Sequence, residues 1–467
     1  MQPARFDAVI AELAPLSAAF AQAGYRLYIV GGTVRDLLLG RDLTDLDFDF
    51  TTNARPDAVK SILSGLVDSL WTQGERFGTI AALRGTRSLE ITTHRAEAYS
   101  PDSRKPDVQF SDSVEVDLSR RDFTFNAMAL ELTATAPQLV DPYGGLDDLM
   151  ARRLRTPLSP EESFSDDPLR MLRAARFVAK LAVTPDEALV SAVRTMHERL
   201  SIISAERIRD EFDRLIVTDA VTLGLRFAVE TGLTDHFLPE LPALSLEQDP
   251  IHRHKDVLTH TFAVVENVTK EMPGEFRITR LAALFHDIGK PRTRKVLPGK
   301  GMTFYHHEVV GAKMTRKRMR ELHYSNDDIR RVSELVFLSG RFHTYQMGWT
   351  DSAVRRYVRD AGDVLTELNV LVRCDCTTRS ERKVDALNKR MSELETRIDE
   401  LAQKEELAAL RPEMDGTAVM AHLGIGPSRA VGEAMDFLME IRLDEGLLGD
   451  EEIRRRLDAW WAQHAQG

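Results

Sequence analysis

The stretch GGTVRDLLLGRDLTDLDFDF, Gly31–Phe50, decides the fold expected for the first part of the chain. Two glycines precede an arginine, and a residue without a Cβ lets the backbone approach a ligand closely. Asp47 and Asp49 follow, two residues apart among apolar neighbours. Side chains at i and i+2 of an extended segment point to the same side, so the stretch predicts two carboxylates on one face of a strand. The alternative is a turn followed by an edge strand that alternates charged and apolar residues.

The composition is that of a globular protein. The 467 residues, 43% of them hydrophobic, can form large cores, and this length predicts about two to four domains. No run approaches the roughly 18 consecutive apolar residues of a membrane span. The acidic, helix-patterned N-terminal segment is unlike a signal peptide, so we expect a cytoplasmic protein without membrane contact. The net charge of −11 argues against a broadly basic coat, so a polyanionic partner requires a local basic patch.

Secondary-structure signals change along the chain. Short β-rich runs such as RLYIVGG, DLDFDFTT, GTIAAL and SLEITTH alternate with helical patterns such as PDAVKSILSGLVDSL up to about residue 150. Beyond it, apolar residues three and four apart predict helices throughout, and the proline-bearing LPELPALSLEQDP predicts a linker and a boundary near residue 245. We therefore expect a multidomain fold, α/β followed by all-α, divided into residues 1–150, 151–245, 246–385 and 386–467.

Two features of the last helical part have structural interpretations. Apolar residues alternate three and four apart from Val384 to Leu401, but for fewer than three heptads, which favours an amphipathic packing helix over a coiled coil. Cys374 and Cys376 flank Asp375 too closely for a zinc knuckle or a natural disulfide. We expect free, buried thiols in a reducing compartment.

The aspartate pair has a chemical interpretation as well. Two aspartates on a strand can bind a pair of divalent cations at the spacing that clamps the attacking and leaving oxygens of a phosphoryl transfer. The glycine turn before them lets backbone amides approach a triphosphate. Surface strands often alternate charge with apolar residues, so Asp47 and Asp49 alone are a weak signal. The segments EITTHR, LSRRDFTFNAMAL and SDDPLRMLRAARF follow in order and strengthen it, and together they suit nucleotidyl transfer.

Residues 28–216 resemble the head and neck of the bacterial class II tRNA nucleotidyltransferases, the CCA-adding enzymes, and their poly(A) polymerase relatives. The segments GGTVRD and DLDF resemble the first motif of the family, RRDFTFNAM the second, DPYGGLDDL the third, which connects head to neck, and SAERIRDEF the last neck motif. The resemblance implies a nucleotidyltransferase-type mixed β-sheet head followed by a helical neck.

The resemblance also implies residue roles. Gly32 and Arg35 would contact phosphate, and Asp47 and Asp49 would bind Mg²⁺. The residues expected beside the nucleotide are Arg121, Asp122 and, as a supporting polar group, Asn126. Glu90 in LEITTHR is a further candidate carboxylate for the catalytic group, although a glutamate at a strand end is more often only solvated.

The segment SFSDDPLRMLRAARF contains three arginines one turn apart, Arg170, Arg173 and Arg176. A helix start with Asp167 at the N-cap and Pro168 at the first helical position explains the aspartate alone. Like charges on adjacent turns repel, and little acidic compensation lies within the helix, so we expect a polyanionic ligand to offset the repulsion. The family motif implies that Asp167 and Arg170 read the incoming base and that Arg173 and Arg176 support the triphosphate. Asp166 stands where the family motif often has glutamate.

A second constellation follows the expected linker. His260, the adjacent pair His286 and Asp287, and the distant Asp375 have the order of an HD domain, and imidazole with carboxylate ligands suits a hydrolytic divalent metal of undetermined identity. His307 resembles a further site residue, and Lys290 is a candidate phosphate contact. Ser339 and Gly340 stand where another histidine would favour a second metal, so we expect one.

The C-terminal part, residues 386–467, resembles the helical region that follows HD domains in this family and is a candidate tRNA contact. Its GIGPSRAVG turn could hold an RNA phosphate at a helix N-terminus or could simply connect two helices.

The sequence predicts a template-independent tRNA nucleotidyltransferase that builds or repairs the 3′-terminal CCA from CTP and ATP. tRNA, CTP and ATP are the expected partners, and no stable protein partner is implied. The alternatives are a poly(A) polymerase or an enzyme that adds only CC or only A. An alternative of another class is an RNA-binding or nucleotide-sensing regulator with a silent head and a working HD phosphohydrolase. The complete Asp47/Asp49 and Arg121/Asp122 sets argue against that regulator.

Overall fold

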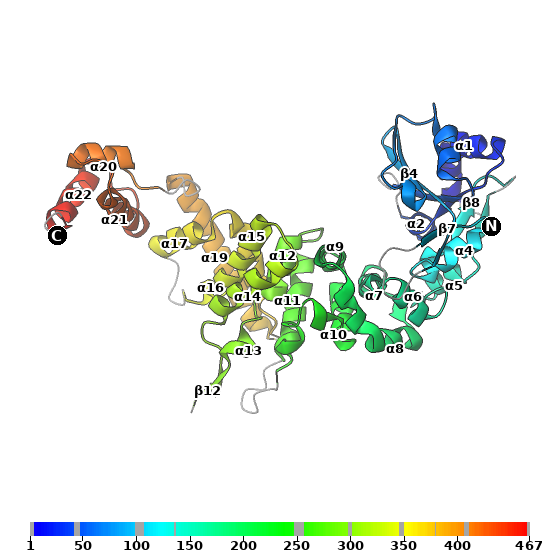
Figure 1. The fold of residues 1–467 in the computed structure, drawn as a ribbon. Helices are drawn as coiled ribbons and strands as arrows, with labels where there is room; N and C mark the ends of the chain where they lie inside the picture. Colours follow the sequence, from blue (N-terminus) through cyan, green and yellow to red (C-terminus); the bar gives the residue numbers. More distant parts are fainter. Residues whose placement is uncertain are drawn as a thin grey trace. The chain divides into compact units, whose positions relative to one another are not determined.

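The chain forms two compact units, Met1–Phe237 and Leu238–Gly467. The computed structural model describes residues 4–41, 47–98, 107–134, 137–246, 256–297, 301–344, 350–378, 380–405 and 411–464. Figure 1 shows the large sheet in the first unit and mainly helices in the second. The division into four parts expected from the sequence stays a prediction.

A seven-stranded mixed sheet forms the core of the first unit. Its strand order is β3-β4-β5-β2-β1-β8-β9, and β2 and β5 form the one parallel pair within it. The strands are β1 (Leu27–Val30), β2 (Phe48–Thr52), β3 (Ser69–Trp71), β4 (Thr79–Arg84), β5 (Arg87–Thr93), β8 (Ala129–Glu131) and β9 (Gln138–Val140). Helix α1 (Ala4–Gln22) packs against β1, and α3 (Pro56–Leu63) packs against β4 and β5.

The alternation of β2 positions the predicted aspartates. Phe48 and Phe50 are buried, whereas Asp49 between them is exposed. The parallel register places Asp49 directly opposite Glu90 of β5. A period of two therefore turns the aromatic rings into the core and the carboxylate away from it.

Helices follow the sheet in the first unit. They are α4 (Val114–Ser119), α5 (Gly145–Met150), α6 (Pro160–Asp166), α7 (Leu169–Leu181), α8 (Glu187–Met196), α9 (Ala205–Ile216) and α10 (Val221–Glu230). Helix α7 packs against α9 and α10. It begins one residue later than expected, with Pro168 at the N-cap, although the Asp167 carboxylate still accepts a hydrogen bond from the Leu169 backbone N–H at 3.1 Å.

The second unit is almost entirely helical. Its helices are α11 (Val257–Glu271), α12 (Arg277–Phe285), α13 (Lys290–Thr293), α14 (His307–Glu321), α15 (Asn326–Leu338), α16 (Arg341–Thr344), α17 (Asp351–Ala361), α18 (Leu365–Cys374), α19 (Glu381–Glu405), α20 (Gly416–Leu423), α21 (Arg429–Glu445) and α22 (Asp450–His464). Helix α19 buries Met391, Leu394 and Leu401 and packs against α17 and α18, as expected for a packing helix. The expected α/β head followed by all-α parts is confirmed.

Two expectations about local structure were wrong. The helix predicted over residues 56–70 ends at Leu63, because Gly65 adopts φ +79° and residues 69–71 form β3. Residues 238–246 of the expected linker are not a free connection, and its last four residues, 247–250, lie outside the described residues. Leu238, Leu241 and Leu244 are fully buried, and the 3-10 turn Pro242–Leu244 packs against α11 and α13. Pro242 begins this turn, and the leucines around it are buried.

Cys374 is buried and Cys376 half-buried, and both are free thiols. Burial is the largest cause that raises the pKa of Cys374, to about 12, so this thiol stays protonated and unreactive.

Within the described ranges, no helix combines the length and the apolar character needed to cross a bilayer.

Candidate active sites

Three carboxylates lie near one another at the start of β2 and on the adjacent strand β5. Asp47 precedes β2, Asp49 lies in it, and Glu90 is the register partner of Asp49 on β5. All three residues are exposed overall, although the surrounding protein partly desolvates the carboxylates of Asp49 and Glu90. The structure therefore brings the predicted catalytic group together, including Glu90, which the sequence alone could not distinguish from a solvated strand-end residue.

The charges of this group are poorly balanced. Partial burial raises the pKa of Asp49, the charge of Arg121 lowers it, and the charge of Asp47 raises it again, with a net increase. Partial burial also raises the pKa of Glu90, and the charges of Asp49 and Asp47 add to that increase. A divalent cation with oxygen ligands would relieve this repulsion, so the residues fit a Mg²⁺-type site.

Arg121 lies beside the carboxylates and against the glycine turn. Gly31 has φ +70°, and a Cβ there would lie 2.9 Å from Nη1 of Arg121. A larger residue would therefore be strained and would also displace the guanidinium. Arg121 Nη2 lies 3.3 Å from Oδ2 of Asp117, and its buried Nε has no hydrogen-bond partner among the described residues. This arginine keeps a donor for a further acceptor.

Arg35 has a different environment from the one the family motif implies. Its side chain is buried, donating to both oxygens of Asp36 at 3.0 and 2.8 Å and to Oδ1 of Asn126 at 2.7 Å. A Cβ on Gly32 would lie 3.4 Å from Nη2 of Arg35. Arg35 thus holds the amide of Asn126, and a phosphate contact by Arg35 or Gly32 stays a prediction.

Asp122 is the centre of a buried polar network. It accepts hydrogen bonds from Nδ2 of Asn126 and Nε of Arg173, both at 2.9 Å. Burial raises the pKa of Asp122, but Arg173 and Asn126 outweigh this and hold it well below its usual range. The carboxylate is therefore ionised and fixed, and it joins the second motif to helix α7.

Two of the three arginines of α7 have acidic partners on other elements, whereas Arg170 donates to neutral groups. Arg176 forms an ion pair with Glu211 of α9, and both side chains are buried. Arg173 pairs with Asp122. The expectation that repulsion along α7 requires a polyanion was therefore wrong, since these partners supply the missing acidic charge. Roles for Arg173 and Arg176 at the triphosphate stay predictions.

Asp167 and Arg170 lie in the same pocket but contact protein groups. Oδ2 of Asp167 accepts a hydrogen bond from Nη2 of Arg207 on α9 at 2.9 Å. Arg170 donates to Oγ of Ser163 at 3.0 Å and to the carbonyl oxygen of Arg120. The two predicted base-reading groups are close in space, but their donor and acceptor atoms are satisfied by the protein.

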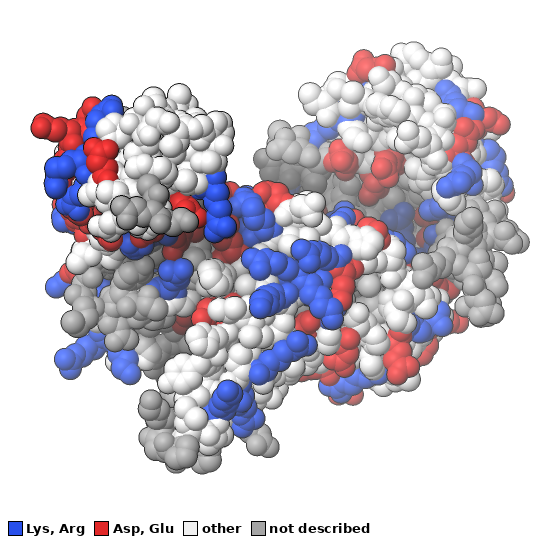
Figure 2. Space-filling view, turned by 60° about the vertical axis from the view of Figure 1, so that its left-hand side comes forward, with Lys and Arg blue, Asp and Glu red and all other residues white. Residues whose placement is uncertain are grey.

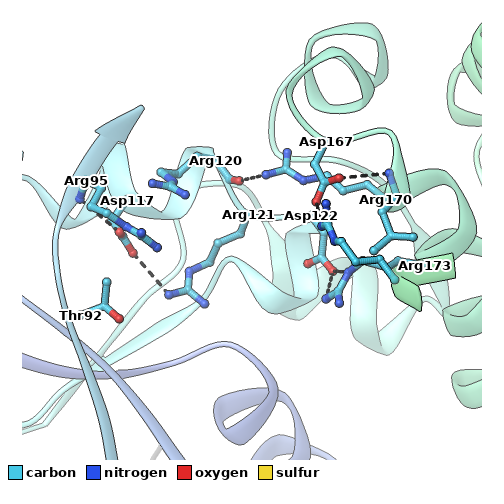
Figure 3. Close-up of a pocket in the computed structure, with 11 residues that line it drawn as sticks. Thr92, Arg95, Asp117, Arg120, Arg121, Asp122, Asp167, Arg170 and Arg173 are labelled. Carbon is cyan, nitrogen blue, oxygen red and sulfur yellow. Dashed lines mark hydrogen bonds and ion pairs between the residues drawn. The ribbon is translucent and has the colours of Figure 1, made fainter. Parts of the chain in front are cut away.

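The pocket has a volume of about 320 Å³ and is lined mainly by polar groups. Figure 3 shows Thr92, Arg95 and Asp117 on one side of it and Asp167, Arg170 and Arg173 on the other. The sequence did not single out six of the lining residues, namely Thr92, Arg95, Asp117, Arg120, Leu169 and Arg207. The sequence could have pointed to Arg120 and Arg207, because they lie inside the motifs RRDFTFNAM and SAERIRDEF.

The third motif, DPYGGLDDL, supports the chain segment next to this pocket. Asp141 accepts hydrogen bonds from the backbone N–H groups of Gly145 and Leu146 at 2.7 and 2.9 Å. A Cβ on Gly145 would lie 2.2 Å from the carbonyl oxygen of Thr124, in the 3-10 turn Thr124–Asn126. Helix α5 can therefore pack directly on the turn that carries Asn126.

The second candidate site is the HD constellation, which the second unit assembles as expected. Nε2 of His260 lies 2.9 Å from Oδ1 of Asp375 and 3.6 Å from Oδ2 of Asp287. Nε2 of His286 lies 3.4 and 3.3 Å from the same two oxygens. His260, His286 and Asp287 therefore form a group compact enough to hold a metal ion, and Asp375 lies beside both imidazoles, so the set fits a single divalent cation.

Contacts of the other ring nitrogen, Nδ1, orient the two imidazoles. Nδ1 of His286 lies 2.7 Å from the carbonyl oxygen of Ala283, and Nδ1 of His260 lies 2.8 Å from Oγ1 of Thr377. These contacts turn both Nε2 atoms toward the centre. Burial lowers the pKa of His286, but Asp287 and Asp375 outweigh this and raise it to about 10. Without a cation, the acidic pair holds a proton on this imidazole instead.

Two further residues named from the sequence lie beside this centre, although a phosphate contact by Lys290 stays a prediction. Nζ of Lys290 lies 2.6 Å from Oδ2 of Asp287, and Nε2 of His307 lies 3.5 Å from its Oδ1. Gly289 permits this arrangement, since a Cβ there would lie 2.1 Å from the carbonyl oxygen of His307. The turn after His286 and Asp287 is therefore in direct backbone contact with α14.

Comparisons with known proteins agree with this architecture. The family described as "Poly A polymerase head domain" matches residues 27–155, "Probable RNA and SrmB- binding site of polymerase A" matches residues 183–244, and "HD domain" matches residues 257–397. The A-adding tRNA nucleotidyltransferase of Deinococcus radiodurans is 32% identical over 448 residues, covering 94% of this chain and 96% of that protein. The CC-adding tRNA nucleotidyltransferase of Thermus thermophilus is 32% identical over 442 residues, covering 92% and 93%.

Among solved structures, the Bacillus stearothermophilus CCA-adding enzyme in complex with CTP covers 100% of both chains with a TM-score of 0.72 and 23% identity. That similarity supports a shared fold. The identity to the Deinococcus relative, together with its near-complete coverage, supports common descent. This chain belongs to the tRNA nucleotidyltransferase family.

Proposed function

We propose that this protein adds nucleotides from CTP and ATP to the 3′ end of tRNA, building or repairing the terminal CCA and releasing pyrophosphate. The observation that carries the proposal is the group Asp47, Asp49 and Glu90 with Arg121 beside it and an arginine-rich pocket behind it. The names of the relatives support tRNA as the substrate. They cover both A addition and CC addition, so an enzyme limited to one of them is the alternative, as is a poly(A) polymerase. The tRNA substrate also favours a cytoplasmic location.

The carboxylates and Arg121 divide the chemistry between them. Asp47, Asp49 and Glu90 would hold divalent cations, Mg²⁺ in this proposal, which when bound neutralise phosphate charge and favour the ionised 3′-hydroxyl. One of the two aspartates accepts the proton of that hydroxyl. The guanidinium of Arg121, which lines the pocket, donates to a phosphate oxygen.

Base choice is assigned to Asp167 and Arg170. The carboxylate accepts from an exocyclic amino group, and the guanidinium donates to a ring nitrogen, a pattern that cytosine and adenine share. Arg170 must exchange its contacts with Ser163 and the Arg120 carbonyl group to reach a base. Arg207, which also lines the pocket, donates to Oδ2 of Asp167, and the Leu169 backbone N–H donates to Oδ1, so the base must share an oxygen of Asp167 or replace Arg207.

The test uses tRNAs that end before the first C, before the second C and before A, each incubated with Mg²⁺ and every nucleotide singly and in combination. CCA addition predicts C, C and A in that order, followed by termination. Extension of only one of the three tRNAs would identify a CC- or A-adding enzyme, and untemplated A tails on any RNA would identify a poly(A) polymerase. No incorporation from any nucleotide would contradict the proposal.

A second activity is supported by the convergence of His260, His286, Asp287 and Asp375. We infer a metal-dependent phosphohydrolase at this centre, with Lys290 as a phosphate contact. Replacing His286 and Asp287 together by alanine should abolish phosphatase or 2′,3′-cyclic phosphodiesterase activity while nucleotide addition continues. If the unmodified protein hydrolyses no phosphate ester with Mg²⁺, Mn²⁺, Ni²⁺ or Co²⁺, the centre has a structural or RNA-positioning role.

A further inference from the structure

A stripe of basic side chains runs along helix α14, outside both candidate sites. Lys313, Arg316, Lys317 and Arg320 are all exposed, and they stand three and four residues apart on one side of the helix. At 1.5 Å per residue the stripe is roughly 10 Å long. We call these four residues the α14 stripe.

Most basic residues around the stripe have acidic partners, but three of its members do not. Arg318 of the same helix pairs with Glu240 and Glu321, and Arg330 of α15 pairs with Asp327, Glu334 and Asp363. Within the stripe, Nζ of Lys317 lies 3.7 Å from Glu321. Lys313, Arg316 and Arg320 form no ion pair with any residue that the structure describes.

The positive charges of the α14 stripe that lack acidic partners destabilise the helix that carries them. Like charges at i,i+3 and i,i+4 destabilise a helix, and the stripe contains four such pairs. The chain as a whole carries a net charge of −11, which would repel a polyanion. Figure 2 shows Lys and Arg side chains in separate groups among acidic ones, not as a continuous coat. A polyanionic ligand must therefore be held at such local groups.

A pocket next to the stripe provides more than charge. It has a volume of about 520 Å³ between α14 and α15, and Arg316 and Arg320 form one wall. Asn326, Ile329 and the half-exposed ring of Phe337 form the other wall, with Arg330 and Glu334. The pocket combines positive charge with a polar amide and an accessible aromatic ring. This combination suits a nucleic-acid strand, because phosphates need charged contacts whereas bases need polar or stacking contacts.

The stripe serves a ligand different from that of the metal centre. His307 begins α14, and at 100° per residue the middle of the stripe lies roughly 130° around the helix from it. A phosphate ester bound at His286 and Asp287 would therefore not lie along the stripe. The occupant must be large enough to reach this other face.

We propose that the α14 stripe and its pocket bind the sugar-phosphate backbone of the tRNA, away from its reacting 3′ end. This inference rests on the proposed function for the identity of the RNA. The contact is electrostatic and independent of RNA sequence. It would contribute affinity through release of counterions from the RNA.

The test compares Arg316→Gln/Arg320→Gln with the unmodified protein by filter binding to tRNA over a salt series. We expect a Kd about 5- to 10-fold weaker near 0.1 M salt and a slope of log K against log salt smaller by about 2. The matched control is Lys270→Gln/Lys389→Gln, which removes the same charge from two exposed lysines that have acidic neighbours on α11 and α19. The control should leave both values unchanged.

A charge-conserving variant separates binding from folding. Arg316→Lys/Arg320→Lys should keep the affinity within about twofold, because phosphate contacts of this kind need charge more than geometry. A double-glutamine variant with the Kd and salt slope of the unmodified protein would overturn the inference. An unmodified protein that neither binds nor extends tRNA would instead overturn the proposed function, so the two failures are distinguishable.

Discussion

Single residues of the head explain why we propose a divalent cation there. Asp49 and Glu90 both have a raised pKa, so their ionised forms are penalised in the folded state. Their contribution to stability is present at acid pH and is lost as the pH rises through the raised values. At pH 8 without divalent metal, these carboxylates therefore destabilise the folded first unit.

From this imbalance we predict that Mg²⁺ raises the melting temperature of the unmodified protein at pH 8 more than that of Asp49→Asn. In excess chelator, Asp49→Asn should melt no lower than the unmodified protein, because the substitution removes a repelled charge. Differential scanning calorimetry with and without Mg²⁺ measures both. The control is Asp57→Asn, which changes an exposed aspartate on α3. An equal response to Mg²⁺ in Asp49→Asn would contradict the metal assignment.

Base choice gives the second residue-scale prediction. For uracil or guanine, the carboxylate of Asp167 would face a carbonyl group and Arg170 an N–H group. Each unsatisfied group costs roughly 1–3 kcal/mol, or about 10- to 100-fold. Arg170→Ala should therefore lower the use of CTP and ATP and relax discrimination against UTP and GTP. Steady-state incorporation of all four nucleotides decides this. A variant that is slow but keeps its full preference would show that Arg170 is structural.

For the head, the sequence was a better guide to the important residues than to the contacts that they form. Asp47 and Asp49 could be found because their spacing is local. The pairing of Asp49 with Glu90 depends on strand register, which no local pattern contains. For the same reason the partners of Arg173 and Arg176, which come from Asp122 and α9, could not be foreseen.

At the scale of elements, close backbone contacts explain the glycine of the HDIGK segment. Gly289→Ala should destabilise the second unit by about 1–3 kcal/mol, because the new Cβ meets backbone atoms of His307 and Gly311 at 2.1 and 2.7 Å. It should also weaken metal binding at His286 and Asp287. Thermal unfolding and Mn²⁺ titration measure the two effects.

Gly432 provides the matched comparison for that substitution. It lies in α21 with an ordinary helical φ, and a Cβ added there would meet no atom within 4 Å. Gly432→Ala should therefore stabilise α21, by up to about 1 kcal/mol. If Gly289→Ala were as well tolerated as Gly432→Ala, the contact between the metal-site turn and α14 would be less tight than described.

The junction of β2 and β5 gives a pH prediction. Buried His94 lies 2.8 Å from Oγ1 of Thr51 through Nδ1, and burial is the main cause that lowers its pKa to about 4. The unfolded chain binds this proton near pH 6.5, so stability falls as the pH drops from about 6.5 to 4. The melting temperature of the first unit should fall more steeply over this range than that of His94→Gln. Parallel curves would show that His94 does not titrate as described.

Elements were predicted well where periodicity was long and poorly where a turn intervened. Helices α7 and α9 follow clear 3.6-residue patterns. The pattern over residues 56–70 contained a turn at Gly65 that apolar spacing does not reveal. The leucines of residues 238–244 were assigned to a linker because prolines dominate the local signal, whereas their burial depends on distant helices.

At the scale of the whole molecule, the chain carries two chemically different sites on two units. The carboxylates and Arg121 belong to the first unit, and the His–Asp centre belongs to the second. The sequence order of motifs predicted this separation, because each set of motifs is contiguous along the chain. The α14 stripe was not foreseen, since its significance depends on which neighbouring charges are paired in three dimensions.

The central claim is that nucleotide addition occurs at Asp47, Asp49 and Glu90 and not at the His–Asp centre. The most direct measurement is incorporation of labelled CTP and ATP into tRNA, made side by side for the unmodified protein, Asp49→Asn and the double variant His286→Ala/Asp287→Ala. We predict that Asp49→Asn loses on the order of 10³-fold or more in rate while still binding tRNA, and that the double variant retains its rate. Near-normal incorporation by Asp49→Asn, or its loss in the double variant alone, would contradict the account.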